Sequence, residues 1–214
     1  FQAIDGHIIV LKKVFISALF FCLMNRGISD KNILDKFAEE FCEIVERYVK
    51  YIIVSGFVAI SHGRKRTTED IDMIIERISF EKFRELDYDL DKAGFECMQS
   101  SKAEDIYNYL ANGDSVRYVR KGRDFLPPEM EIKFVKDDLD ELQIKTRKKF
   151  DFTGLNLWFS SIEFNVAFKE ELLKSNKDLE DARHLRIIYK DEIDNNFIEE
   201  IKRKIRKLRL KDER

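Results

Sequence analysis

The sequence predicts an α/β (α+β) fold: a short mixed sheet with flanking helices, followed by a C-terminal group of helices. Up to residue 159, short β-branched runs alternate with amphipathic helical stripes. From residue 160 onward, the apolar spacing is helical throughout. The chain has 214 residues, 44% hydrophobic and 37% charged, with two prolines. This composition is typical of a globular, helix-rich protein and excludes disordered and fibrous classes.

Three regions are expected: an apolar N-terminal extension over residues 1–24, an α/β core over residues 25–159 and a helical region over residues 160–214. The apolar run from Val14 to Met24 is too short to span a bilayer. No small-residue cleavage site follows it, so we expect no export and no membrane partner. We take a native start near Met24 as a hypothesis. Three cysteines without a CxxC pair indicate a reducing, cytoplasmic setting.

The first half of the core is predicted from the period of its apolar residues. Helical spacing, a β-branched run and a Ser-Gly turn follow one another before a second strand that begins with Asp70-Ile71-Asp72. The elements are a helix over 30–50, a strand over 51–54, a turn at 55–56, a short helix over 57–61 and a strand over 71–75.

The second half of the chain alternates again and then becomes helical. We expect helices over 81–92, 103–110 and 137–149, and strands over 95–98, 115–120 and 129–135, with a turn at Pro127-Pro128. One or two short strands are expected within 150–159, around the Thr153-Gly154 turn. Ser160 and Glu163 read as a capping box. Helices at about 161–174, 178–189 and 196–210 follow.

The stretch between residues 54 and 72 carries the chemistry. Residues two apart in a strand point to the same side, so Asp70 and Asp72 project together while Ile71 enters the core. Two carboxylates on a rigid strand suit Mg²⁺ or Mn²⁺, which bridges triphosphate oxygens. Ser55 and Gly56 open a helix whose free amides attract an anion, and the glycine permits close approach.

Between the two halves of this pattern lie Arg64, Arg66 and Thr68. A guanidinium matches phosphate oxygens, so both arginines are candidates for the β- and γ-phosphates. The alternative is a solvated loop. Each half alone is a weak signal, but the two in this order favour a nucleotide site.

The stretch resembles the signature of the DNA polymerase β-like nucleotidyltransferase superfamily, and Arg66-x-Thr68-x-Asp70-Ile71-Asp72 is most similar to the minimal prokaryotic members that include the AbiEii toxins. The resemblance implies metal-dependent transfer of a nucleoside monophosphate from an NTP such as ATP to an acceptor hydroxyl, with release of pyrophosphate. In related families the acceptor is an RNA end, a protein or a small molecule. The sequence does not choose among them.

Glu131 is the candidate for a third carboxylate, which a two-metal reaction needs to activate the attacking hydroxyl. It lies on one face of a predicted strand with Lys133. The superfamily often has aspartate at this place. Glu129 is the fallback, and an exposed strand edge is the alternative.

Lys169 falls inside the apolar arc of its predicted helix, where a lysine is costly to bury without a partner. Asp178 and Asp181 share a face of the next helix. One interpretation is a buried ion pair that joins the two helices. In the other, all three residues line the nucleotide cleft, with Lys169 on phosphate. The AbiEii-like resemblance favours this second interpretation, because that group carries a comparable lysine and a later aspartate.

Two other functions stay open: a nucleotide- or RNA-binding module of the same fold without turnover, and a toxin–antitoxin component. His62 and His184 have no second histidine or cysteine at ligand spacing, so we expect ordinary surface or boundary histidines. The net charge of −2 decides nothing about nucleic acid.

Overall fold

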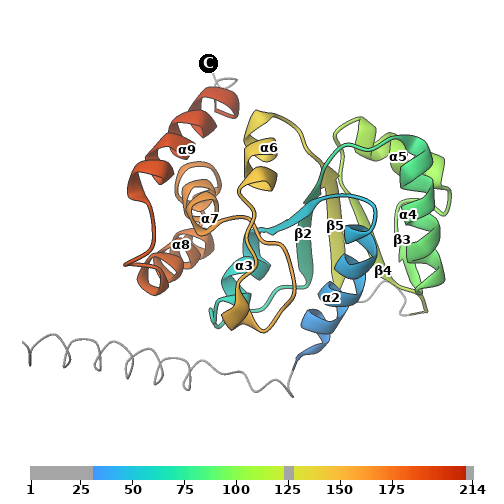
Figure 1. Cartoon of the computed structure of the whole chain (residues 1–214), viewed down its shortest axis with the longest axis horizontal. Coiled ribbons are helices and arrows are strands. Elements are labelled where there is room, and N and C mark those ends of the chain that lie inside the picture. Colours follow the sequence, from blue (N-terminus) through green and yellow to red (C-terminus); the bar gives the residue numbers. More distant parts are fainter. Residues whose placement is uncertain (1–30, 123–127, 211–214) are drawn as a thin grey trace, which may run out of the picture.

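The computed structural model describes residues 31–122 and 128–210 (Figure 1). The predicted extension over residues 1–24 and Pro127 lie outside the described residues. The elements in chain order are α2 (Ile33–Glu46), β1 (Tyr51–Val54), α3 (Ser55–Ser61), β2 (Asp70–Ile75), α4 (Phe80–Lys92), β3 (Phe95–Cys97), α5 (Ala103–Ala111), β4 (Val116–Arg120), β5 (Glu129–Phe134), α6 (Asp138–Lys145), a 3₁₀ turn (Asp151–Thr153), α7 (Ile162–Phe168), a π-helical turn (Lys169–Leu173), α8 (Asn176–Ile188) and α9 (Asn195–Leu208).

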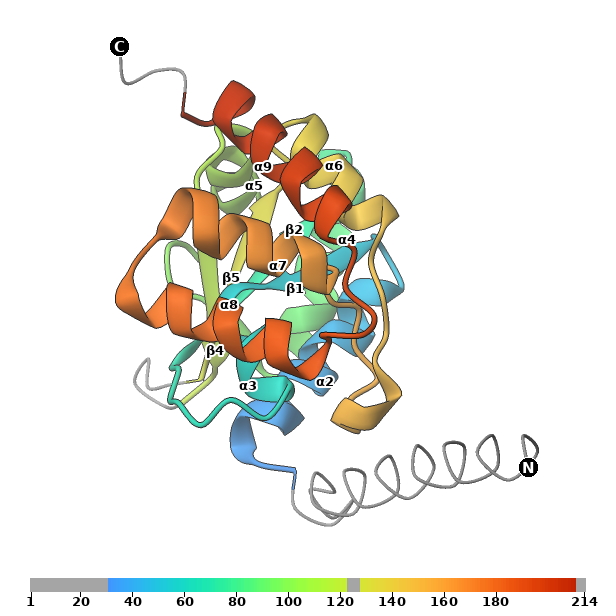
Figure 2. The same cartoon turned by 90° about the vertical axis from the view of Figure 1, so that its left-hand side faces the viewer.

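The five strands form one mixed sheet in the order β1-β2-β5-β4-β3. β2 and β5 pair in parallel, and the other three pairs are antiparallel. The α/β class with a short mixed sheet and flanking helices is therefore confirmed. The C-terminal helices lie beside the β1 end of the sheet, away from α4 and α5 (Figures 1 and 2).

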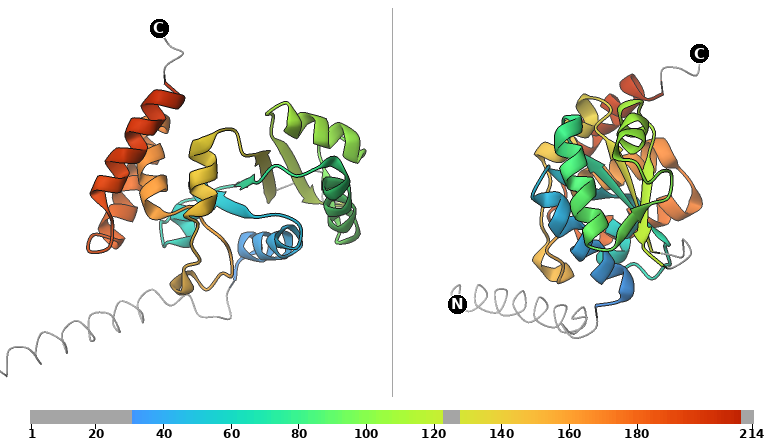
Figure 3. Two further views of the ribbon diagram at one scale, coloured as in Figure 1. Left: turned by 45° about the horizontal axis from the view of Figure 1, so that its top comes forward. Right: turned by 90° about the vertical axis from the view of Figure 1, so that its right-hand side faces the viewer.

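The two faces of the sheet differ in character. On one face, Ile71, Met73 and Ile75 of β2 join the main hydrophobic core with residues of α2, α4 and α5, which gather on that side (Figure 3). On the other face, α6 covers only part of the sheet, where Ile74 packs with Ile144. The charged residues of β2 lie on this second face, because side chains alternate along a strand.

The segment expected to form strands around Thr153 does not. It forms a 3₁₀ turn that ends at Gly154, whose φ is 68°, and only Phe159 makes bridges, to Ile53 and to Lys148. The Thr153 hydroxyl donates to the Phe150 carbonyl at 2.7 Å, a local bond that competes with strand pairing.

The expected capping box is also shifted. Ser161 caps α7, with its hydroxyl oxygen 3.4 Å from the Phe164 amide. Ser160 instead donates its hydroxyl proton to Gln143 of α6 at 2.8 Å. The single helix expected over 161–174 is an α-helix followed by the π-helical turn.

The C-terminal helices have a core of their own, which contains Leu139 of α6 and apolar residues of α7, α8 and α9. Polar contacts tie α9 to α6: Arg209 donates to Asp137 at 2.7 Å and to the buried Asp140 at 2.9 Å. Within the described residues, every helix falls short of the length and apolar character needed to cross a membrane.

We predict that Arg209→Ala lowers the free energy of unfolding by about 2 kcal/mol, because Asp140 then loses a charged partner in a buried position. Urea denaturation measures the change. Arg206→Ala on the same helix is the matched control, since Arg206 is exposed and pairs with Glu171 at 2.9 Å. Its effect should stay within about 0.5 kcal/mol. Equal losses in both variants would contradict the prediction.

Candidate active site

Four carboxylates project from the open face of the sheet. In the register of the strands, Asp70 lies opposite Glu129, and Asp72 lies opposite Glu131. Directly paired residues point to the same side of a sheet. Ile71, between the two aspartates, is fully buried in the main core. The structure therefore brings the predicted pair of aspartates together on one face.

Two hydroxyls hold these aspartates. The Thr68 hydroxyl lies 2.9 Å from a carboxylate oxygen of Asp70 and 3.1 Å from its carbonyl. Burial raises the pKa of Asp72, and the negative charges of Asp70 and Glu131 raise it further. A hydrogen bond from Ser55 and the charge of Lys133 oppose this rise. Thr68 thus contacts one of the two aspartates, and its predicted part in nucleotide binding stays a prediction.

The Ser55-Gly56 turn departs from ordinary backbone geometry. Ser55 follows Val54, which pairs with Asp72, and it has a φ of 63°. A non-glycine residue in this left-handed region stores about 1–3 kcal/mol of strain, and such residues cluster at ligand sites. A Cβ on Gly56 would lie 2.6 Å from Nη2 of Arg66, so the end of the arginine side chain would have to shift to admit it. The Arg66 guanidinium thus lies directly over the glycine.

A cluster of buried charges joins this turn to the C-terminal helices. Arg66 pairs with Asp181 of α8, and Arg64 lies 3.4 Å from the same carboxylate and pairs with Glu180. Lys169 lies 3.0 Å from Asp181 and 3.3 Å from Asp178. Lys169 and Asp181 are fully buried.

The structure therefore contains the ion pair that was one interpretation of Lys169. The other interpretation, a role on phosphate, stays a prediction. Lys169 begins the π-helical turn that follows α7.

Glu131 is paired with a cation in the structure. Arg117 of β4 donates to the Glu131 carboxylate at 3.0 Å and lies 3.7 Å from Glu129. Among residues 31–122 and 128–210, no three His, Cys, Asp or Glu side chains are arranged to hold a metal ion. The third-ligand role of Glu131 thus stays a prediction.

Asp70 and Asp72 alone still suit Mg²⁺ or Mn²⁺. Magnesium in phosphate-transferring sites is bound by one or two carboxylates, with water and substrate phosphates supplying the remaining oxygens. Burial and then repulsion by Asp70 and Glu131 raise the pKa of Asp72, so a cation at this place would relieve an unfavourable concentration of negative charge.

We expect His62 at the surface or at a boundary, but the structure places it in the core. Its ring lies against four aromatic rings, with centroid distances of 4.8 Å to Phe150, 5.0 Å to Phe152, 5.9 Å to Phe159 and 5.6 Å to Tyr189. Its Nδ1 lies 2.6 Å from the Val58 carbonyl, and Nε2 of the half-buried His184 lies 2.9 Å from the His62 carbonyl. The four aromatic rings and His184 are distant from His62 in the sequence, so local pattern gave no signal of its burial.

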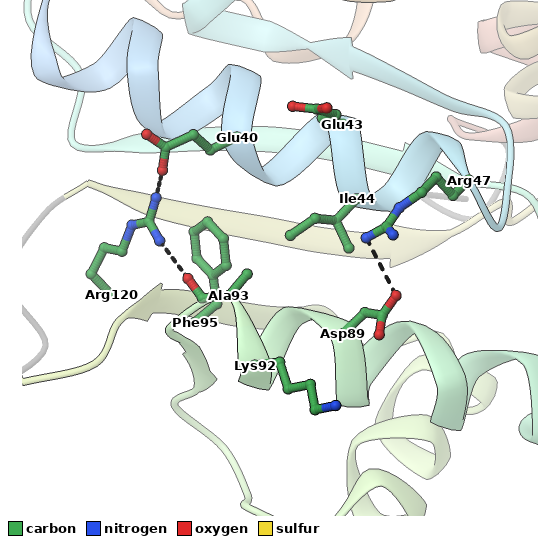
Figure 4. Close-up of a pocket in the computed structure, with 9 residues that line it drawn as sticks. All are labelled: Glu40, Glu43, Ile44, Arg47, Asp89, Lys92, Ala93, Phe95 and Arg120. Carbon is green, nitrogen blue, oxygen red and sulfur yellow. Dashed lines mark hydrogen bonds and ion pairs between the residues drawn. The ribbon is translucent and has the colours of Figure 1, made fainter.

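A separate hollow of about 530 Å³ opens between α2 and α4 (Figure 4). Its charged groups largely pair with one another: Arg47 lies 3.3 Å from Asp89, and Arg120 pairs with Glu40 and donates to the Ala93 carbonyl at 2.8 Å. The Arg47–Asp89 pair joins α2 to α4. The hollow shares no residue with the site described above.

No protein-family model matches the chain, and no curated protein matches it. Among solved structures, the chain is similar to ANT(2″)-Ia in complex with adenylyl-2″-tobramycin, with a TM-score of 0.49 and 14% identity over 81% of this chain and 97% of that chain. It is also similar to the conserved protein GrpB from Enterococcus faecalis, with a TM-score of 0.37 and 16% identity over 81% and 90% of the two chains. Both scores are too low to support an assignment of function.

The buried His62 predicts a loss of stability in acid. Burial lowers the pKa of His62 from 6.5 to about 4, the hydrogen bond to Val58 opposes this shift, and His184 adds to it. As the pH falls, His62 is therefore protonated in the unfolded chain before it is protonated in the folded protein. The free energy of unfolding falls as the pH drops from about 6.5 to about 4. The full contribution is at most about 3 kcal/mol.

Urea denaturation between pH 7.5 and 4 measures this loss. His62→Phe should flatten the pH dependence over that window, because the variant has no imidazole to protonate. His184→Gln is the comparison variant and should retain most of the slope, because His184 is the smallest of the causes that shift the pKa of His62. An unchanged slope in His62→Phe would refute the prediction.

Proposed function

We propose that the chain is a nucleotidyltransferase that moves a nucleoside monophosphate from an NTP to an acceptor hydroxyl and releases pyrophosphate. One observation carries the proposal: Asp70 and Asp72 share a face of β2 beside the Ser55-Gly56 turn, and Arg66 lies on that turn. Carboxylates for a cation thus adjoin a glycine and cations suited to polyphosphate. The Arg66 to Asp72 motif supports membership of the polymerase β-like superfamily, and its AbiEii-like branch is the finer proposal.

Each residue has a role in this proposal. Asp70 and Asp72 would hold Mg²⁺ or Mn²⁺, which when bound neutralises triphosphate charge. Thr68 and Ser55 fix the two carboxylates. Gly56 admits the β- and γ-phosphates close to the backbone, and positive side chains attract them. The positive side chains proposed to attract these phosphates are Arg64, Arg66 and Lys169. Asp178 and Asp181 hold the lysine in place.

Catalysis in such a site comes from positioning and from electrostatic stabilisation. Glu131 is the carboxylate proposed to ready the attacking hydroxyl, from the strand position opposite Asp72. To do so it must exchange its partner Arg117 for the acceptor. The acceptor is proposed to be an RNA end, a protein or a small molecule.

A second candidate function is nucleotide or RNA binding without turnover. The Glu131–Arg117 pair favours it, because Arg117 occupies the carboxylate that would have to contact the attacking hydroxyl. Both candidates place the nucleotide in the same site, so they differ in turnover and not in location.

Transfer of label separates these candidates. The protein is incubated with α-³²P-labelled NTP, Mg²⁺, total RNA and lysate protein, and label on macromolecules is counted. We expect Asp70→Asn and Asp72→Asn each to reduce transfer at least about 100-fold, as loss of a principal electrostatic group does. Asp138→Asn, an exposed acid on α6, is the control and should retain transfer.

Saturable nucleotide binding without any transfer would favour the binding module. Transfer at the unsubstituted rate by the Asp70→Asn and Asp72→Asn variants would overturn the proposed site.

Removing Arg117 should strengthen metal binding. In Arg117→Gln, Glu131 loses its guanidinium partner and a positive charge leaves the acid face. We expect Mn²⁺ to bind about fivefold more tightly, which corresponds to about 1 kcal/mol. Electron paramagnetic resonance of free Mn²⁺ measures the affinity. The double variant Arg117→Gln/Glu131→Gln should lose most of this gain, and weaker binding by Arg117→Gln would contradict the prediction.

A further inference from the structure

We propose that Asp181 competes with polyphosphate for Arg66: without nucleotide it holds the Arg66 guanidinium over Gly56, and an incoming polyphosphate must take Arg66 from it. This inference rests on the proposed function, because it treats Gly56 and Arg66 as groups that bind polyphosphate. It adds a resting state in which the protein's own carboxylate satisfies the phosphate-binding arginine.

The position of Arg66 is the first observation. A Cβ placed on Gly56 would lie 2.6 Å from Nη2, 3.1 Å from Cζ and 3.4 Å from Nη1 of Arg66. The whole end of the side chain therefore covers the glycine. A phosphate that approaches this backbone needs the volume that the guanidinium now fills, so the guanidinium must move for the phosphate to enter.

The bonding of Arg66 is the second observation. Its Nη1 donates to Asp181, while its Nε is buried and has no hydrogen-bond partner. A guanidinium has five N–H donors, so this contact leaves it far from saturated. A phosphate group offers more free acceptor oxygens than a carboxylate that other cations already share. The arginine therefore gains bonds when it changes partner.

The third observation is that Asp181 is not left unpaired when Arg66 leaves. Lys169 lies 3.0 Å from Asp181, and Arg64 lies 3.4 Å from it. Breaking a buried ion pair is costly chiefly because a charge remains buried without a partner. Here two cations stay with the carboxylate, so the exchange avoids that penalty. Polyphosphate can therefore displace Asp181 from Arg66 without leaving a buried charge unpaired.

The competition also connects the site to the C-terminal helices. Arg66 belongs to the segment between α3 and β2, and Asp181 belongs to α8. Binding of polyphosphate removes one tie between these two parts of the chain. The apparent affinity for polyphosphate equals the intrinsic affinity multiplied by the fraction of molecules in which Arg66 is already free, so a small free fraction weakens binding.

The test measures binding of inorganic tripolyphosphate, without metal, by isothermal titration calorimetry. We expect Asp181→Asn to bind it about tenfold more tightly than the unsubstituted protein, because the competitor is gone. Arg66→Gln should bind it more weakly. In the Arg66→Gln background, adding Asp181→Asn should give no gain. Glu180→Gln is the matched control, since it removes a neighbouring acid that pairs only with Arg64 among the contacts described.

The variants also separate this competition from a general change in charge. Three results would each overturn the competition: an unchanged or lower affinity in Asp181→Asn, an equal gain in Glu180→Gln, or a gain that persists with Arg66→Gln. If the unsubstituted protein still binds tripolyphosphate, the proposed function stays intact in all three cases. Tripolyphosphate binding by none of the proteins would instead overturn the proposed function itself.

Hydrogen exchange of the unsubstituted protein gives a second measurement that does not depend on folding of a variant. Tripolyphosphate should accelerate amide exchange in the first half of α8, because Asp181 loses a partner there. Unchanged or slower exchange in that half would overturn the competition.

Discussion

The alternation of side chains along β2 is the constraint on which the rest of the site depends. It sends Ile71, Met73 and Ile75 into the main core and leaves Asp70 and Asp72 on the open face. A slip of one residue in register would bury both carboxylates and expose the apolar set. Burying ionised carboxylates without partners is strongly unfavourable, so folding of the core fixes the acid pair.

The same register extends the acid face across the sheet. β5 pairs with β2 in parallel, and its own alternation places Met130, Ile132 and Phe134 in the core. Glu129 and Glu131 must then face the same side as the aspartates. Arg117 of β4 lies opposite Glu131 in the antiparallel register and neutralises part of this charge. The net result is a sheet face on which Asp70 and Asp72 have hydroxyl partners and the glutamates have a guanidinium.

The joint between the α/β core and the C-terminal helices has a different physical basis. Apolar and aromatic contacts around His62 pack Phe150 and Tyr189 together, while Asp181 binds cations from two parts of the chain. Buried ion pairs are often no more stabilising than well-packed apolar residues of the same volume. Stability alone therefore does not account for three cations around one buried carboxylate, and this arrangement is the one that the proposed exchange with polyphosphate requires.

The sequence was informative where local periodicity decides the outcome. Period-2 alternation predicted that Asp70 and Asp72 share a face, and the helical wheel predicted that Lys169 lies inside. Contacts between distant segments had no such signal. The Arg117–Glu131 pair depends on β4 lying next to β5, and the cage around His62 depends on residues 88 or more positions later in the chain. The expected strand near Thr153 failed because a side-chain bond to the backbone formed a 3₁₀ turn instead.

Arg66 takes part both in a local sequence pattern and in a contact between distant segments. Its place in the motif follows from a short sequence pattern, yet its partner Asp181 lies 115 residues away on α8. The acids belong to the sheet, and the buried lysine belongs to the helical group, so neither part alone assembles the proposed site. Because the Arg66 guanidinium contacts the turn and the helix at once, any ligand that binds at Gly56 must also change the tie between the two parts. Ligand binding and the packing of α8 are thus thermodynamically linked through one side chain.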